Sequence, residues 1–351
     1  MNAGADPFGP PGGRPADGEP AASEAAIRAH GGRPIWLTTS DGLRLRAARF
    51  PALVGDDREA APVLFLNGRA DFIEKNLEGL AELRRRGHAV WTLDWRGQGR
   101  SARLLADPLR GHALDFGIFV EDLERFVDHF IRPEIGERRL LLFAHSMGGN
   151  IGLRFLRGRQ SLFERAVLVA PMIGLRTRVP SRTLLRVLPW AACRVLGRAE
   201  QYALGQDPAG PQARGFEGNR LTSCPIRFQR TLNWLNHDPS LWVGGTTWSW
   251  VRAALATTAI TAEVAFAERI EVPILVIAAG AERIVDNRAM ARLVERLPKG
   301  RLAIIPDARH ELLLESDGLR QTVWREIDDF LGRAGQPRTP SRDASLELAA
   351  S

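Results

Sequence analysis

The chain has 351 residues, 44% of them hydrophobic and 25% charged, which is the composition of an ordinary globular protein. Its formal net charge of +7 raises nucleic acid as a partner, but the arginines are scattered beside acidic residues rather than gathered in one tract, so we expect no nucleic-acid binding. Cys193 and Cys224 are the only cysteines, which argues against a disulfide framework or a cysteine metal site.

The beginning of the chain is rich in Ala, Gly and Pro and lacks the basic start and apolar centre of a secretory signal. We expect residues 1–32 to be a disordered segment and residues 333–351 to be a disordered tail. No uninterrupted apolar stretch approaches the roughly 18 residues that a membrane-spanning helix needs. The protein is therefore expected to be cytoplasmic.

Strand and helix patterns alternate from residue 33 to residue 171. An Asp-Gly turn between alternating runs predicts a hairpin of two strands at 35–39 and 43–50. Short apolar runs predict buried strands at 62–66, 88–93, 140–144 and 166–170. Helical periodicity covers 72–86 and 116–130. This alternation predicts an α/β fold with a mostly parallel sheet, which binds ligands at the carboxyl ends of its strands.

The stretch from 140 to 156 has the pattern of a nucleophile elbow. Its apolar strand ends in His145-Ser146-Met147-Gly148, and a helical pattern follows. Strand, sharp turn and helix would raise the Ser146 hydroxyl above the strand ends. The first small residue of the motif is Ala144 rather than Gly, which we interpret as a mild departure.

Residues 172–267 lose the strand signals and read as a helix-rich insertion, which we interpret as a cap over the site. Alternation resumes over 268–332, with strands expected at 273–279 and 301–305 and helices at 287–297 and 319–331. The expected core is therefore 33–171 together with 268–332. Of the seven histidines, His310 alone follows the last expected strand.

The loop from Asp94 to Ser101 carries Gly97 and Gly99 but lacks the ending of a phosphate loop, so nucleotide binding is not expected. We interpret it as a structural turn near the site, in which Asp94 and Arg96 pair with each other.

Several motifs, in this order along the chain, resemble the bacterial lysophospholipases and monoacylglycerol lipases, a branch of the α/β-hydrolase superfamily with serine aminopeptidase-like members. They lie at 68–75, 94–101, 144–149, 280–287 and 309–315, with cap segments at 170–172 and 244–248. The resemblance covers about residues 33–331. It implies an α/β-hydrolase fold, with an eight-stranded sheet, helices on both faces and a helical cap.

The resemblance also implies the roles of single residues. Ser146 would be the nucleophile and His310 the general base, and the backbone N–H groups of Met147 and Arg69 would form the oxyanion hole. Relatives often have His-Gly before the second of these donors, whereas this chain has Asn67-Gly68. Backbone donation survives that change, and we expect the side-chain support of the loop to differ.

The acid of the triad has two candidates. Many relatives place an Asp two residues after the glycine that ends the strand, and here that position is Glu282. Asp286 follows four residues later. A glutamate can orient an imidazole as an aspartate does, so we favour Glu282 and expect Asp286 to cap the next helix.

The expected function is cleavage of a carboxylic ester in a lysophospholipid or monoacylglycerol through an acyl-enzyme intermediate, with a small acyl ester as substrate and no metal or organic cofactor. One alternative is a serine aminopeptidase-like peptidase. Another is a catalytically inactive hydrolase-like binding protein, which the departures at Asn67, Ala144 and Glu282 keep open.

The cap segment 183–199 mixes arginines with leucine, valine and Trp190, as a basic amphipathic helix does. Two interpretations stay open for it. The first, which we favour, is that its apolar residues pack the cap onto the sheet. The second is peripheral contact with an anionic membrane surface, which would place the protein at the inner face of the membrane.

Overall fold

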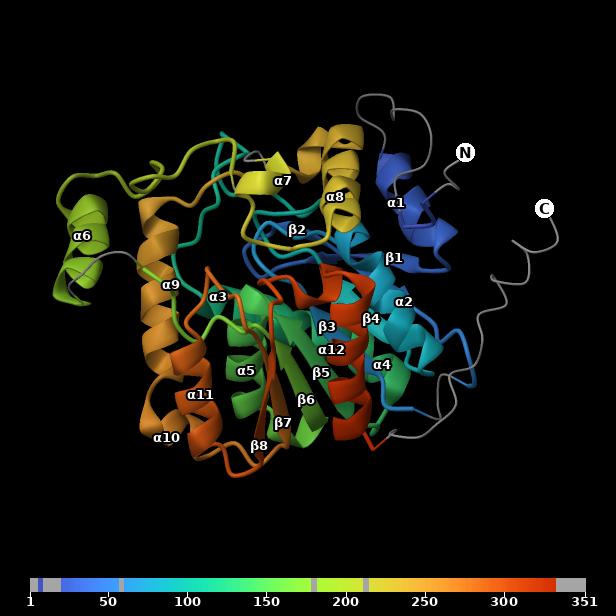
Figure 1. Cartoon of the computed structure of the whole chain (residues 1–351). Coiled ribbons are helices and arrows are strands. Elements are labelled where there is room, and N and C mark those ends of the chain that lie inside the picture. The colour runs from blue at the N-terminus through green and yellow to red at the C-terminus, as the bar shows by residue number, and fades with distance from the viewer. Residues whose placement is uncertain (1–5, 9–19, 57–59, 178–181, 211–214, 333–351) are drawn as a thin grey trace.

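A twisted sheet runs through the centre of the molecule (Figure 1). The computed structural model describes residues 6–8, 20–56, 60–177, 182–210 and 215–332. The strands are β1 (Arg33–Thr38), β2 (Arg44–Phe50), β3 (Val63–Leu66), β4 (Val90–Leu93), β5 (Leu140–His145), β6 (Phe163–Val169), β7 (Ile274–Ala279) and β8 (Gly300–Ile305).

The eight strands lie in the order β1-β2-β4-β3-β5-β6-β7-β8. Strand β2 pairs antiparallel with both β1 and β4, and every other neighbouring pair is parallel. The inner strands β3, β4, β5 and β7 are buried along their whole length. This explains why they appear in the sequence as unbroken apolar runs rather than as alternating ones. The predicted α/β-hydrolase fold is confirmed.

Helices cover both faces of the sheet. The longer helices of the core are α2 (Leu77–Arg85), α3 (Gly117–Phe126), α5 (Ser146–Gly158), α11 (Asn287–Arg296) and α12 (Asp317–Phe330), and the short α4 (Arg132–Ile135) precedes β5. Helices α3, α5 and α11 lie on one side, and α2 and α12 lie on the other (Figure 1). Parallel strands joined by crossover helices produce this layering.

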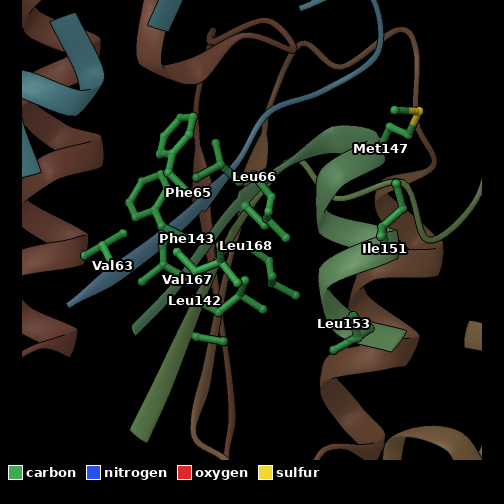
Figure 2. Close-up of a cluster of buried hydrophobic side chains, with 14 of the residues drawn as sticks. Val63, Phe65, Leu66, Leu142, Phe143, Met147, Ile151, Leu153, Val167 and Leu168 are labelled. Atoms are coloured by element: carbon green, nitrogen blue, oxygen red, sulfur yellow. The ribbon is translucent and has the colours of Figure 1, made fainter. Parts of the chain in front are cut away.

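The contact between α5 and the sheet fixes the turn that precedes the helix. Met147, Ile151 and Leu153 on α5 and Leu66 and Leu142 on the strands belong to one buried apolar cluster (Figure 2). A Cβ atom at position 148 would lie 2.4 Å from the carbonyl oxygen of Asn67. Glycine is therefore required there for the start of the helix to approach β3.

The expectation of disorder over residues 1–32 is wrong for its second half. Helix α1 spans Pro20–Ala29, and its Ala26 and Ile27 are buried in the core. The indole N–H of Trp36 donates a hydrogen bond of 2.9 Å to Glu24, which ties the helix to β1. Residues 1–5 and 9–19, as well as the expected tail at 333–351, lie outside the described residues.

The segment from 172 to 267 consists, where it is described, of helices joined by loops. It contains α6 (Arg182–Arg194), α7 (Gly215–Gly218), α8 (Pro225–His237), α9 (Trp248–Thr261) and α10 (Val264–Ala267). Helix α6 packs on α9 and stands at the edge of the molecule, away from the sheet (Figure 1). Within the described ranges, no helix is both long and apolar enough to cross a bilayer.

Sheet packing is the wrong interpretation for the apolar residues of α6. Trp190 is 54% exposed, and Leu184, Val187 and Leu188 are each at least 45% exposed. The interpretation holds for other parts of the segment, because Trp234 and Trp250 are buried.

Candidate active site

Ser146 lies at the junction between β5 and α5. Its φ of 50° is in the left-handed region, which costs a non-glycine residue about 1–3 kcal/mol. The strain persists because β5 is fully buried on one side of the junction and Gly148 lets α5 approach β3 on the other. This is the sharp turn that the sequence pattern predicts.

Three side chains from distant parts of the chain meet at this junction. The Ser146 Oγ lies 2.8 Å from Nε2 of His310, and Nδ1 of His310 lies 2.7 Å from Oε2 of Glu282. All three residues are buried. With its proton on Nδ1, the imidazole donates to the carboxylate and accepts from the serine hydroxyl, as a general base must.

Glu282 and Asp286 have different surroundings. The Oε1 atom of Glu282 accepts hydrogen bonds from the backbone N–H groups of Arg283 and Ile284, at 2.8 and 2.7 Å. Burial raises the pKa of the Glu282 carboxyl, but the charge of His310 and hydrogen bonds from His310, Ile284 and Val285 outweigh burial and leave the pKa below its usual range. Asp286 instead caps α11, where its side chain accepts from the N–H of Arg288 at 2.9 Å.

The loop after β3 carries Arg69, one of the two expected oxyanion donors. Within the loop, Asp71 accepts from the Gly68 N–H at 2.8 Å. From the 94–101 turn, the Gln98 side chain donates to the Gly68 carbonyl and accepts from the Ala70 N–H. The Trp95 indole donates to the Asn67 carbonyl. The other expected donor, Met147, directly follows Ser146 in the first turn of α5. Side chains of the 94–101 turn therefore support the loop, although the sequence did not predict how.

A buried ionic cluster joins the Arg69 loop to the end of β5 and to the loop after β8. Sequence reasoning did not predict this cluster. Lys75 forms ion pairs with both Asp71 and Glu311, and Asp71 lies 3.4 Å from Nδ1 of His145. Burial lowers the pKa of Lys75, but the two carboxylates raise it more, so its net pKa lies above the usual range. The cluster connects the residue after His310 to the residue before Ser146 and to the Arg69 loop.

The expected pairing of Asp94 with Arg96 is wrong. Asp94 pairs with Arg46, and Arg96 pairs with Asp122 and Asp41. These partners are distant in sequence, so the 94–101 turn is fixed by β2 and α3 rather than by its own charges.

A pocket with a volume of about 240 Å³ opens beside Ser146 and His310. Its wall combines core residues with residues of the 172–267 segment: Arg69, His145, Gly205, Gln206, Asp207, Gly210, Gly218, Arg220, Leu221, Ile284 and Glu311. The Arg69 side chain also contacts the 172–267 segment. Its Nη1 donates to the carbonyl of Gly244 at 3.0 Å, and its guanidinium lies 5.8 Å from the ring of Trp250. Burial lowers the pKa of Arg69 to about 10.

The sheet and this arrangement of serine, histidine and glutamate at its edge define the class of α/β-hydrolases. The profile of one family, described as serine aminopeptidase, S33, matches residues 57–317, and the chain belongs to that family. Within the superfamily it lies in the lysophospholipase and monoacylglycerol lipase branch, which confirms the resemblance found in the sequence. The protein is accordingly a carboxylic-ester hydrolase.

Two relatives and one solved structure illustrate the match. Lysophospholipase L2 of Escherichia coli K12 is 35% identical over 308 residues, 86% of this chain and 88% of the relative. The probable lysophospholipase L2 of Haemophilus influenzae is 31% identical over 77% of this chain and 83% of its own length. The Saccharomyces cerevisiae monoglyceride lipase, solved with a substrate analog, is similar in fold, with a TM-score of 0.66 at 18% identity over 86% of this chain and 96% of its own.

Proposed function

We propose that Ser146, His310 and Glu282 form a catalytic triad that hydrolyses the acyl ester of a lysophospholipid or a monoacylglycerol. The observation that carries this proposal is the continuous chain of two short hydrogen bonds, 2.8 and 2.7 Å, from the serine hydroxyl to the glutamate. The names of the bacterial relatives support the lysophospholipid as substrate.

In the proposed reaction, His310 takes the proton of the Ser146 hydroxyl while the Ser146 oxygen attacks the ester carbonyl. Glu282 stabilises the imidazolium that forms, and the imidazolium then protonates the leaving alcohol. Water, deprotonated by His310, hydrolyses the acyl-enzyme intermediate. The backbone N–H groups of Arg69 and Met147 would hold the oxyanion, and losing one such donor typically costs about 10²–10³ in rate.

The arrangement of the chain supports a proposed division into a core at 33–171 and 268–332 and a cap at 172–267. Cap residues Gln206, Asp207 and Arg220 share the pocket wall with Ser146. A peptidase would need an acidic residue to bind the amino group of its substrate. Of the two acidic residues on the pocket wall, Glu311 is paired with Lys75, whereas Asp207 accepts from the N–H of Gly210 at 3.0 Å and keeps further acceptor sites, so Asp207 is the residue that a peptidase would use.

The first experiment tests the nucleophile and the substrate class together. The wild-type protein should react with a fluorophosphonate probe, and Ser146→Ala should abolish both labelling and turnover. Parallel assays on p-nitrophenyl esters, a lysophospholipid, a monoacylglycerol and an aminoacyl amide should show ester cleavage with little amide cleavage. Labelling that persists in Ser146→Ala would contradict the triad, and amidase activity above esterase activity would favour the peptidase.

We also propose that α6 binds the surface of an anionic membrane. Its exposed apolar residues accompany three exposed arginines, Arg186, Arg194 and Arg198, and no acidic residue lies on the helix. A basic amphipathic helix of this kind binds at the boundary between head groups and acyl chains. Such contact would bring the pocket close to lipid substrates.

A further inference from the structure

A second cavity adjoins the pocket of the proposed active site. Its volume is about 580 Å³, and its wall contains Arg176, Arg220, Arg283 and Thr177. Arg220 belongs to the walls of both cavities. A molecule bound with an ester group at Ser146 can therefore extend past Arg220 into a space bordered by three guanidinium groups.

These three arginines differ from those that surround Glu78. Arg227, Arg230 and Arg320 all pair with Glu78. In contrast, no carboxylate of the described residues forms an ion pair with Arg176, Arg220 or Arg283, and all three side chains are exposed. Like charges that border one cavity without a counter-ion repel one another, and an anion placed between them relieves this repulsion.

Two of the arginines, Arg176 and Arg283, are tied to the loop that carries Glu282. Arg176 donates a side-chain hydrogen bond to the backbone carbonyl of Glu282, and its own N–H donates to the Ile284 carbonyl at 3.0 Å. Arg283 directly follows Glu282, and its N–H bonds to the carboxylate that contacts His310. The loop that carries the acid therefore carries one of the three positive charges, Arg283, and holds a second, Arg176, by hydrogen bonds.

We propose that Arg176, Arg220 and Arg283 bind the phosphate of the substrate's head group while Ser146 attacks the acyl ester. Guanidinium groups bind phosphate oxygens with paired, charge-assisted hydrogen bonds, which makes arginine well suited to this role. In a lysophospholipid only the glycerol unit separates the acyl ester from the phosphate, as the adjoining cavities require. This inference rests on the proposed function, and it selects the lysophospholipid over the phosphate-free monoacylglycerol.

The test compares two esters that share one short acyl chain and are kept below their micelle-forming concentrations. One is a lysophospholipid and the other a monoacylglycerol. Arg220→Gln and Arg283→Gln should each raise KM for the lysophospholipid about tenfold or more, because each removes hydrogen bonds to a charged group. In Arg283→Gln, whose side chain lies outside the wall of the Ser146 pocket, KM for the monoacylglycerol and kcat for both esters should stay within about twofold of wild type.

Arg325→Gln is the matched control, because Arg325 is an exposed arginine on α12 without an ion pair among the described residues. It should change neither KM. An equal loss on both esters, or no loss on either, would overturn the phosphate site while leaving the esterase proposal intact. A wild-type protein that cleaves neither ester would instead overturn the proposed function itself.

Inorganic phosphate separates a head-group site from a site for free phosphate. In the proposed arrangement, phosphate competes weakly with the lysophospholipid and leaves hydrolysis of the monoacylglycerol unchanged. The opposite result has two parts. Phosphate would protect the wild-type protein but not Arg220→Gln from thermal unfolding, while KM for the lysophospholipid would be the same in both proteins. The site would then serve free phosphate, and the head-group assignment would be wrong.

Discussion

At the scale of single residues, the choice between Glu282 and Asp286 depends on reach and on competing hydrogen bonds. Glu282 lies just after β7 and extends far enough to place Oε2 at His310 while Oε1 accepts from its own loop. Asp286 is committed to the first turn of α11. Asp286 follows Glu282 by four positions, and the turn between them directs only Glu282 toward the imidazole of His310.

The roles of these two carboxylates can be separated by amide substitutions. Glu282→Gln should lower kcat by about 10⁴, because the amide no longer stabilises the imidazolium or its reactive tautomer. Asp286→Asn should retain turnover, since asparagine caps a helix as well as aspartate does. Steady-state assays on one p-nitrophenyl ester measure both effects. Near-normal turnover by Glu282→Gln would rule out its role as the acid.

The same scale shows what the sequence could and could not predict about the site. Ser146 and His310 stand out because local patterns, a strand-turn-helix junction and a loop after the last strand, surround them. The cluster of Lys75, Asp71 and Glu311 has no local signal, since Lys75 and Glu311 are 236 residues apart. Only the fold brings these charges together, because Asp71 and Lys75 follow β3, whereas Glu311 follows β8, with β5, β6 and β7 between the two strands.

At the scale of elements, Glu78 joins three helices. It lies on α2 and pairs with Arg227 and Arg230 of α8 and with Arg320 of α12. Burial raises the pKa of Glu78, but hydrogen bonds and charges from the three arginines outweigh it and lower the pKa to about 2. Through this carboxylate, α8 of the proposed cap is anchored to two helices of the core.

This anchor should make stability depend on pH. The folded pKa of Glu78 lies below the ordinary value of 4.5, so its contribution is complete above that pH and is lost as the pH falls toward 2. The size of the shift corresponds to about 3 kcal/mol. Urea unfolding from about pH 7 to about pH 3 should show the gap between wild type and Glu78→Gln narrowing with acid. A gap that does not change with pH would contradict this assignment.

The order of elements was more predictable than their ends or their partners. Apolar runs of strand length located the inner strands, because these have no solvent-facing side and leave a continuous signal. The Asp-Gly turn located the hairpin of β1 and β2. Helix α1 was missed because its flanking composition of Ala, Gly and Pro indicates disorder. The burial of Ile27 and the bond between Glu24 and Trp36 are tertiary contacts, which composition does not encode.

At the scale of the whole molecule, the position of α6 bears on how the protein would meet its substrate. The helix rests on α9 at the molecular edge (Figure 1), and its Trp190, Val187 and Leu188 are each at least 45% exposed. Sequence periodicity identifies an amphipathic helix but not what its apolar face contacts. Here the fold leaves that face exposed, which favours the membrane interpretation.

Binding to vesicles tests this interpretation. The wild-type protein should bind phosphatidylglycerol vesicles in low salt, and binding should weaken as ionic strength rises, because screening reduces the attraction of the α6 arginines. Substituting Leu188 and Trp190 by serine should weaken binding further. Ile304→Ser, which changes an equally exposed residue on β8, should not. Sedimentation with the vesicles measures all three, and binding that is absent or insensitive to salt would contradict the proposal.

Arg69 gives the architecture a further consequence. Its main chain belongs to the loop proposed to steady the tetrahedral intermediate, while its side chain reaches across to the Gly244 carbonyl and to Trp250. Any displacement of the Gly244 turn breaks that tether. Arg69 therefore links the position of the proposed oxyanion loop to the position of the segment from Gly244 to Trp250, so a substitution of its side chain affects both.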